Sequence, residues 1–555
     1  MKSIKNIFMA LGVAAAGLMT SSCINDLDLQ PIDPSSINSS TFKDDPEAYM
    51  NRVLAEVYIS FVNHGPNNNS QVSGFDGGMS SYARALFNLQ ELPTDEAFWM
   101  STSDAALYTL SFGNITSDNE AIFGTYSRLI INVALCNNFI QTVEDGLFNL
   151  PDNLKDKAAD YVRQCKILRS VCYYNLIDLF GSVPYADEND PMGTNAPQLS
   201  REEIFNRVTT TLEEVVAEYG AGKQTPALNY VGKDVAEGLL VRFYLNSEVF
   251  TGKPAWDKCL AHANNLISAH QGSGFQGSGL AEHFHQCFGA NNYDYALGGA
   301  NAVNEVLWIL PENAPELLSY GGSTLMILGA TTKTDNDLLF YNIGNGWKTF
   351  KGRPDLVNKF EWTDAAQSQS PDSRVKLWHT SADDYVNAMP FTDNNDWQNN
   401  GYQTNKYINR YILADGSVDM EHTPGAQGDG YVTTGYVGMR LAEIYLSAAE
   451  AILHGAGAKA DALKYVNYIR QRAGVRAWSE ADLNLDNLLD ERCRELYHEC
   501  LRRTDLIRAG KWTSGYNWSW KNSLLEGANY PAHYVLYPIP SQIINQSSYV
   551  QNPGY

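Results

Sequence analysis

The chain has 555 residues with 63 acidic and 40 basic side chains, so its formal net charge at pH 7 is −23. A surface of that sign repels polyanions, which argues against nucleic acid and anionic lipid as partners. Hydrophobic residues make up 44% of the sequence and aromatic residues 12%, which is enough for a large core. The chain is therefore expected to be globular rather than disordered.

The first residues have the pattern of a secretory signal, because two lysines precede an apolar stretch from Ile7 to Leu18. Small residues at 20–22 come directly before Cys23, the arrangement that precedes a lipidated cysteine. We therefore predict a lipoprotein signal peptide at residues 1–22 and lipidation of Cys23. The alternative is ordinary cleavage that leaves this cysteine unmodified. No later segment reaches the ~18 uninterrupted apolar residues of a membrane helix, so any membrane attachment is expected through the lipid.

Residues 23–42 show no hydrophobic periodicity and are expected to form a tether. The rest of the chain, 43–555, is expected to fold as one domain. Its first helical pattern ends at Val62 and has apolar residues in three-four spacing, which predicts one buried stripe: Met50, Val53, Leu54, Val57 and Phe61. Similar patterns predict further helices at 119–146, 154–180, 201–219, 233–250, 255–269, 437–454, 458–473 and 485–509.

Two irregular segments interrupt these helices, 63–103 (the first excursion) and 270–436 (the second excursion). Both are rich in Gly, Asn and Asp, and the second contains only short strand-like runs such as Val306–Leu310. Loops this long inside a compact protein are usually functional. The predicted fold is mainly α, a tetratricopeptide-like scaffold of helix pairs with long irregular loops and a few short strands. The two excursions are expected to build a surface together.

Several motifs occur in order along the chain. The first is Leu168-Arg169-x-x-x-Tyr173-Tyr174, which continues to Phe180-Gly181-x-Val183-Pro184-Tyr185. The others are Glu305-Val306-Leu307-Trp308, Asp372-x-Arg374, Lys406-Tyr407, Arg440-Leu441-Ala442-Glu443, Glu491-Arg492-x-Arg494-Glu495, Tyr537-Pro538-Ile539-Pro540 and the terminal Gln551-Asn552-Pro553-Gly554-Tyr555.

In this order the motifs resemble the SusD/RagB family of nutrient-uptake lipoproteins. The resemblance implies a SusD-like fold anchored by lipid in the outer membrane and exposed at the cell surface. It also implies that the protein captures oligosaccharide or polysaccharide and delivers it to a SusC-like TonB-dependent transporter. Glu499-Cys500-Leu501-Arg502 departs from the family pattern, which usually has Glu-Gly, and this puts a local turn in doubt.

The matched residues are interpreted as determinants of the fold rather than as the binding site. Glu491 with Arg494, and Arg440 with Glu443, are three residues apart and could pair along a helix. Gly181 suits the position after a helix end, and Pro184 prevents the helix from continuing. Apart from Cys23, seven cysteines remain, and those inside helical patterns are too far apart to bridge. They are interpreted as free and buried.

No catalytic constellation, cofactor motif or metal site stands out, so the chain is not expected to be an enzyme and no cofactor is expected. A sugar ligand needs aromatic faces and planar polar groups. Members of the family place their ligand on matching excursions, so the predicted glycan-binding residues are Asp76, Arg84, Trp99, Tyr320, Trp347 and Trp397. Asp95 and Arg353 belong to the wider set of candidates, whereas Trp308 is expected in the core.

Two alternatives remain. A RagB-like protein with the same scaffold would take peptide as its cargo, and a surface glycan hydrolase would cleave the sugar chain. The sequence does not specify which glycan is bound or whether a loop holds a metal ion.

Overall fold

The computed structural model describes residues 45–63, 78–190, 195–220, 230–293, 304–313, 316–331, 335–365, 367–379, 402–424 and 430–555. Helices dominate, as predicted. The helices before residue 300 are α3 (Pro46–Val62), α4 (Tyr82–Gln90), α5 (Ala105–Ser111), α6 (Glu120–Glu144), α7 (Lys155–Phe180), α8 (Arg201–Tyr219), α9 (Lys233–Leu245), α10 (Ser247–Thr251) and α11 (Trp256–His270). Those after it are α13 (Gly322–Thr324), α14 (Asp335–Tyr341), α15 (Pro354–Val357), α16 (Leu441–Ala451), α17 (Lys459–Arg472), α18 (Leu485–Leu496), α19 (Arg502–Arg508) and α20 (Ser541–Ile544).

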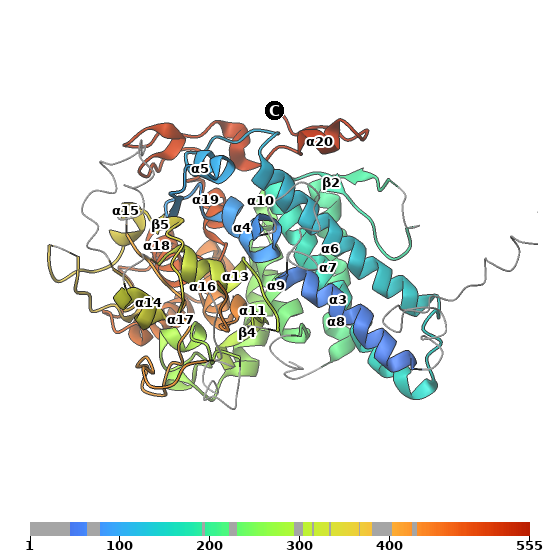
Figure 1. Cartoon of the computed structure of the whole chain (residues 1–555), viewed down its shortest axis with the longest axis horizontal. Helices are drawn as coiled ribbons and strands as arrows, with labels where there is room; N and C mark the ends of the chain where they lie inside the picture. Colours follow the sequence, from blue (N-terminus) through green and yellow to red (C-terminus); the bar gives the residue numbers. More distant parts are fainter. Residues whose placement is uncertain are drawn as a thin grey trace, which may run out of the picture.

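The long helices pack as antiparallel neighbours (Figure 1). Tyr126 near the start of α6 contacts Phe180 at the end of α7, with ring centroids 5.1 Å apart. Phe205 near the start of α8 similarly lies 6.0 Å from Tyr244 near the end of α9. The mainly helical fold is thus confirmed, while the closer likeness to tetratricopeptide pairs stays a prediction. Among the described residues, no helix is long and apolar enough to cross a membrane.

The stripe predicted for the first helix is confirmed in α3. Met50, Leu54, Val57 and Phe61 are buried, and Val53 is half-buried against the core. The helix begins at Pro46 because the preceding Asp45 accepts a hydrogen bond from the backbone N–H of Ala48 at 2.9 Å.

The helix end predicted at Gly181 is also confirmed. Gly181 has φ +72°, and a Cβ at this position would lie 2.8 Å from Leu536 Cδ1, so both conformation and space favour glycine. The terminal motif packs on the same turn. Tyr537 donates its backbone N–H to the carbonyl of Leu179, and the Asn552 side chain donates to the carbonyl of Phe180. Two motifs far apart in the sequence therefore stabilise one turn.

Short antiparallel strand pairs join the excursions to each other and to the scaffold. Three pairs are described: β1 (Ala97–Trp99) with β5 (Phe350–Gly352), β2 (Val183–Pro184) with β3 (Gln198–Leu199), and β4 (Val306–Leu310) with β6 (Tyr436–Arg440). The β1–β5 pair brings the two excursions together. However, the first excursion is not irregular throughout, because it contains the buried helix α4.

Three predicted helices differ in the structure. The pattern at 233–250 is divided at Asn246 into α9 and α10. Residues 436–440 form β6 rather than the start of a helix, because they pair with β4. The pattern at 485–509 is broken into α18 and α19, and His498 and Cys500 between them have φ of +60° and +62°. The backbone N–H of His498 donates to the buried carboxylate of Glu96 instead of continuing a helix.

The motif residues of the second half converge in a buried ion-pair network. Arg440 contacts the carboxylates of Glu305, Glu495 and Glu499 at 2.9, 2.6 and 2.6 Å. Arg374 contacts those of Asp372, Glu491 and Glu495 at 2.7, 2.7 and 3.2 Å. All these side chains are at most 5% exposed. The interpretation of these motifs as fold determinants is confirmed by this packing.

One pair predicted inside the motifs does not form. Arg440 lies in β6 and does not pair with Glu443, whose carboxylate is instead bound by Arg242 at 2.7 Å. The other pair, Glu491 with Arg494, is present at 2.6 Å. Burial alone would raise the pKa of Glu495, but Arg472, Arg440 and Arg374 lower it to about 2.

The described cysteines are all free, as predicted. Six of them are buried: Cys136, Cys165, Cys172, Cys259, Cys287 and Cys493. Cys500, in the break between α18 and α19, is half-buried and lies 3.2 Å from the Tyr436 hydroxyl.

Lys351 in β5 is fully buried, and its ammonium has no hydrogen-bond partner among the described residues. Burial and, to a smaller extent, Lys348 lower its pKa to about 7. Between pH 7 and 10.5 the unfolded chain therefore binds this proton more tightly than the folded chain, and the cost of the buried charge is relieved as pH rises through that window.

Lys351→Met should accordingly raise the melting temperature at pH 6, on the order of a few degrees. Thermal melts of both proteins at pH 8 and at pH 10.5 complete the test. The difference in melting temperature between the variant and the unsubstituted protein should be smaller at pH 8 and close to zero at pH 10.5. A variant that is less stable by the same amount at every pH would show that the ammonium is paired.

Candidate functional site

Three aromatic side chains meet at the surface of the second excursion, and we call Tyr320, Trp347 and Tyr431 the aromatic platform. The rings of Tyr320 and Tyr431 are stacked, with centroids 4.9 Å apart and planes inclined by 30°. The ring of Trp347 lies 6.1 Å from that of Tyr320 at an angle of 54°. All three residues are half-buried, so part of each ring system is fixed by packing and part faces solvent.

The backbone on either side of the platform is held by hydrogen bonds. The hydroxyl of Ser319, next to Tyr320, donates to the carbonyl of Val62 at 2.8 Å. The backbone N–H of Trp347 donates to the carbonyl of Leu328 at 2.7 Å. These bonds attach the two rings to α3 and to the buried turn after α13, which limits their freedom before any ligand arrives.

Buried Glu312 ties the tyrosine segments to each other. Its carboxylate accepts from the backbone N–H groups of Ser323 and Thr324 at 2.8 and 3.1 Å, just after Tyr320. It also accepts from the Thr324 hydroxyl, which in turn accepts from the backbone N–H of Val432, just after Tyr431. Burial raises the pKa of Glu312 to about 8, although the hydrogen bonds from Thr324 and Ser323 oppose that rise.

Arg84 of α4 borders the platform. A Cβ placed on Gly321 would lie 3.2 Å from the Arg84 Cβ, so this side chain starts beside the Tyr320 segment. Its guanidinium carbon lies 5.3 Å from the centroid of the Trp99 ring, within range of a cation–π contact. The structure therefore brings four of the predicted residues into one region: Arg84, Trp99, Tyr320 and Trp347.

Trp99 itself is part of the core and not of the surface. It is 1% exposed, and its indole N–H donates to the carboxylate of Asp104 at 3.0 Å. The ring packs into the main hydrophobic core, and the Arg84 guanidinium lies over it, so a sugar has no access to its face. The structure therefore gives Trp99 a supporting position beneath Arg84 rather than the stacking position predicted for it.

Other predicted candidates lie in the core or outside the described residues. Asp95 is paired with Arg502 at 2.7 Å, and Arg353 donates to backbone carbonyls including that of Ala97 at 3.0 Å; both are fully buried. Trp308 is 2% exposed, as expected of a core residue. Asp76, Trp397 and Cys23 lie outside the described residues.

Sequence reasoning missed Tyr431, the third ring of the platform. It lies in a Gly-rich stretch with no periodicity, and nothing local distinguishes it from the other 31 tyrosines. Only its contact with Tyr320, more than a hundred residues earlier in the chain, gives it a place in the site.

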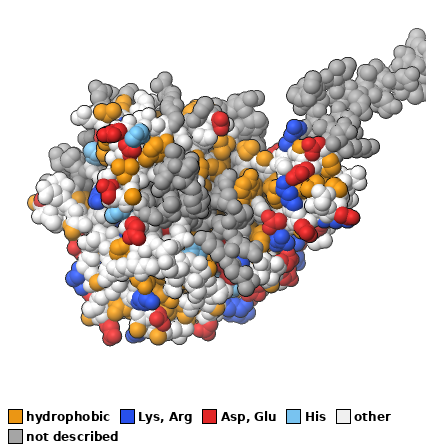
Figure 2. Space-filling model, turned by 90° about the horizontal axis from the view of Figure 1, so that it is seen from below, with side chains coloured by type: hydrophobic (Ala, Val, Ile, Leu, Met, Phe, Trp, Pro, Cys, Tyr) orange, Lys and Arg blue, Asp and Glu red, His pale blue; other side chains and the backbone are white. Residues whose placement is uncertain are grey.

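The arrangement offers aromatic faces and one guanidinium but no catalytic pair. Among the described side chains, no cluster of three or more His, Cys, Asp or Glu residues could hold a metal ion. His285 is buried, and burial lowers its pKa to about 3. Figure 2 shows that on one face of the molecule the described basic side chains are interspersed with acidic ones rather than gathered into a basic surface.

Comparison with known proteins agrees with this fold. The model of the SusD family matches residues 330–555. The starch-binding protein SusD of Bacteroides thetaiotaomicron is 26% identical over an alignment that covers 100% of this chain and 99% of SusD. SusD-like protein P2 of Formosa agariphila is 24% identical over 78% of this chain and 79% of its own.

Among solved structures, the chain is similar to surface glycan-binding protein A from Bacteroides thetaiotaomicron in complex with laminarihexaose. The TM-score is 0.67 at 18% identity, over 91% of this chain and 99% of the other. This likeness concerns the fold, and it extends over nearly the whole chain. The resemblance to the SusD/RagB family predicted from the sequence is therefore confirmed: the chain is SusD-like.

Proposed function

We propose that the protein captures a neutral oligosaccharide or polysaccharide at the cell surface and that the aromatic platform is its binding site. The observation that carries the proposal is the convergence of Tyr320, Trp347 and Tyr431 on half-buried, partly accessible positions. Aromatic faces bind the C–H side of a sugar ring, and an arginine beside them can hydrogen-bond neighbouring hydroxyls.

The relatives support the same ligand class. One is named as starch-binding, and the similar solved structure holds laminarihexaose. Their names describe binding proteins rather than enzymes, in agreement with the prediction that this chain is not an enzyme. The net charge of −23 gives no attraction to polyanions but leaves a neutral ligand unaffected.

Calorimetric titration of the purified protein with a panel of neutral polysaccharides tests this function. We expect at least one neutral glycan to bind. Its affinity should change little between low and high salt, because the ligand carries no net charge. Steep salt dependence, or binding of peptides but of no glycan, would favour the RagB-like alternative with a peptide cargo. New reducing ends after incubation would instead reveal a glycan hydrolase.

The proposal extends to the route of the ligand. A SusC-like TonB-dependent transporter is the partner implied by the family, and the protein would hold the sugar chain and release it into the transporter. Moderate affinity suits this task, because a ligand held too tightly could not be handed on. The protein would be attached to the outer membrane, facing outward, by lipid on Cys23.

The lipid anchor gives a separate prediction. Cys23→Ala should move the protein from the membrane fraction to the soluble fraction, because a single substitution removes the acyl chains. Its affinity for polysaccharide should not change, because Cys23 is not one of the residues proposed to bind the glycan. Fractionation in cells that lack the transporter provides the control, since the transporter alone could retain the protein. Full retention in those cells would contradict lipidation at this residue.

A further inference from the structure

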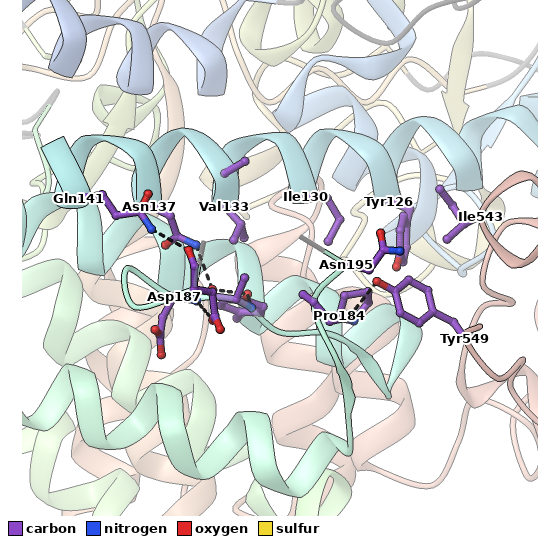
Figure 3. Close-up of a pocket in the computed structure, with 15 residues that line it drawn as sticks. Tyr126, Ile130, Val133, Asn137, Gln141, Pro184, Asp187, Asn195, Ile543 and Tyr549 are labelled. Carbon is purple, nitrogen blue, oxygen red and sulfur yellow. Dashed lines mark hydrogen bonds between the residues drawn. The ribbon is translucent and has the colours of Figure 1, made fainter. Parts of the chain in front are cut away.

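A cavity of about 290 Å³ lies away from the aromatic platform. One wall is a face of α6, since its residues there are spaced three or four apart, from Tyr126 to Gln141. Residues that follow β2, namely Ala186, Asp187, Asp190, Asn195 and Ala196, line the opposite wall, and Ile543 and Tyr549 of the C-terminal segment close one end (Figure 3). No residue of the platform lines it, so a ligand here would be independent of the platform.

The middle of the cavity is apolar, with Ile130, Val133 and Pro184 on its walls. Both ends are polar. Figure 3 shows Tyr126, Asn195 and Tyr549 at one end and amide and carboxylate side chains at the other. An apolar middle between two polar ends suits a ligand with an apolar face and a hydroxyl-bearing rim.

Tyr126 provides the strongest indication of a ligand. The residue is 2% exposed, and its hydroxyl has no hydrogen-bond partner among the described residues. A buried hydroxyl without a partner is unfavourable, and nearly all such groups in folded proteins are paired. Burial raises the pKa of Tyr126, so the group stays a neutral donor. Tyr549 beside it donates to the carbonyl of Ala196 at 3.0 Å and keeps its own oxygen as an acceptor.

The polar groups at the other end shape the wall. Asn137 donates to the carbonyl of Ala186 at 3.0 Å, and Gln141 donates to those of Glu188 and Asp190 at 2.9 and 2.8 Å. These bonds fix the segment after β2 against α6, so the cavity is built before a ligand enters it.

The lining also limits the charge and size of the ligand. Among the described residues, no lysine or arginine lines the cavity, and its ionisable carboxylates belong to Asp187 and Asp190, so an anion is disfavoured. Its volume of about 290 Å³ is just below the range of roughly 300–1,000 Å³ typical of ligand pockets. One ring-sized molecule fits such a space, whereas several units of a polymer do not.

We propose that this cavity is a second binding site, which takes a single neutral sugar ring or a polyol of similar size with a hydroxyl on Tyr126. The site lies on the scaffold helices and does not depend on the function proposed for the platform. It would hold the end of a glycan or a small product of glycan breakdown, because only one ring can enter.

The test uses the full chain carrying Tyr320→Ala and Trp347→Ala, so that the platform does not contribute. Saturation-transfer NMR with methyl glucoside, methyl galactoside and methyl mannoside measures binding of neutral rings. At least one of them should bind to this protein. Glucuronate, tested beside them, should bind more weakly because of Asp187 and Asp190.

Two further substitutions identify the cavity. Ala134→Trp places a large ring at an exposed position of the wall and should abolish the signal. Tyr126→Phe should weaken binding by up to roughly tenfold, the effect of one lost hydrogen bond. In the absence of sugar, Tyr126→Phe should melt at the same temperature or a higher one, because it removes an unpaired buried hydroxyl.

The outcomes separate the two proposals. Loss of polysaccharide binding by the platform variant, with methyl hexosides still bound, supports both sites. If none of the hexosides binds, or if their affinity is unchanged by both Ala134→Trp and Tyr126→Phe, the second site is overturned. A clear loss of stability in Tyr126→Phe without sugar would also overturn it, since the hydroxyl would then have a partner within the protein.

Discussion

Arg440→Met is expected to destabilise the folded protein by about 3–5 kcal/mol, the usual cost of removing one partner from a buried ion pair. The guanidinium of Arg440 contacts three buried carboxylates, those of Glu305, Glu495 and Glu499. Removing it leaves negative charge inside the core that the remaining cations only partly balance. Because a whole domain is typically stable by only about 5–15 kcal/mol, this single change should bring the protein close to unfolding.

Urea denaturation followed by fluorescence measures the effect. Arg476→Met is the matched control, because Arg476 also binds a carboxylate, that of Asp482, but its own side chain is 64% exposed. Solvent screens that pair, and its loss should leave the midpoint nearly unchanged. The midpoint of Arg440→Lys should lie between those of the other two variants, because lysine keeps the positive charge but lacks the planar guanidinium whose N–H groups reach several carboxylates. Equal midpoints for Arg440→Met and Arg476→Met would show that the buried network contributes no more than a surface pair.

The pH dependence of the same network has a defined sign. The pKa of Glu495 is about 2 in the folded protein, below that of an ordinary glutamate, because its arginine partners outweigh burial. A carboxyl group whose pKa is lower in the folded protein than in the unfolded chain stabilises the fold at pH values above its unfolded pKa. This stabilisation is lost as the pH falls through the folded pKa. Acid should therefore destabilise the protein between about pH 4.5 and pH 2, and the difference between Arg440→Met and the unsubstituted protein should narrow there.

The helical scaffold could be predicted because its signal is local. The stripe of α3 and the glycine that ends α7 each depend on residues within a few positions of one another, and the structure confirms both. The break between α18 and α19 could not be predicted in this way. It is stabilised by the bond from His498 to Glu96, whose positions differ by 402 in the sequence.

The candidate site was less predictable for the same reason. The resemblance to a family directed attention to both excursions, and Tyr320, Trp347 and Arg84 do lie together. Aromatic composition could not distinguish the buried ring of Trp99 from the accessible ring of Trp347. That difference arises from tertiary packing, because Trp99 lies within the main hydrophobic core whereas Trp347 only packs against it.

Trp347→Ala is expected to weaken polysaccharide binding roughly ten- to a hundredfold. Loss of one stacking surface costs on the order of 1–3 kcal/mol, by analogy with the stacking of other flat ligands on aromatic rings. Tyr320→Ala should have at least as large an effect, because its ring contacts both other rings of the platform and its loss also frees Tyr431. Trp347 and Tyr320 are half-buried, so neither substitution should prevent folding.

Two controls make this prediction specific to the platform. Trp256→Ala removes another half-buried tryptophan, which stacks on His454 at 4.1 Å on the scaffold, and it should leave glycan affinity unchanged. Trp99→Ala removes a buried ring, so its main effect should be a lower melting temperature. Any loss of glycan affinity in this variant should arise indirectly, because Arg84 is displaced. Calorimetry of the four variants beside thermal melts distinguishes these effects. Normal binding by both Trp347→Ala and Tyr320→Ala would place the glycan elsewhere on the protein, because no sugar that stacks on the platform could tolerate the loss of either ring.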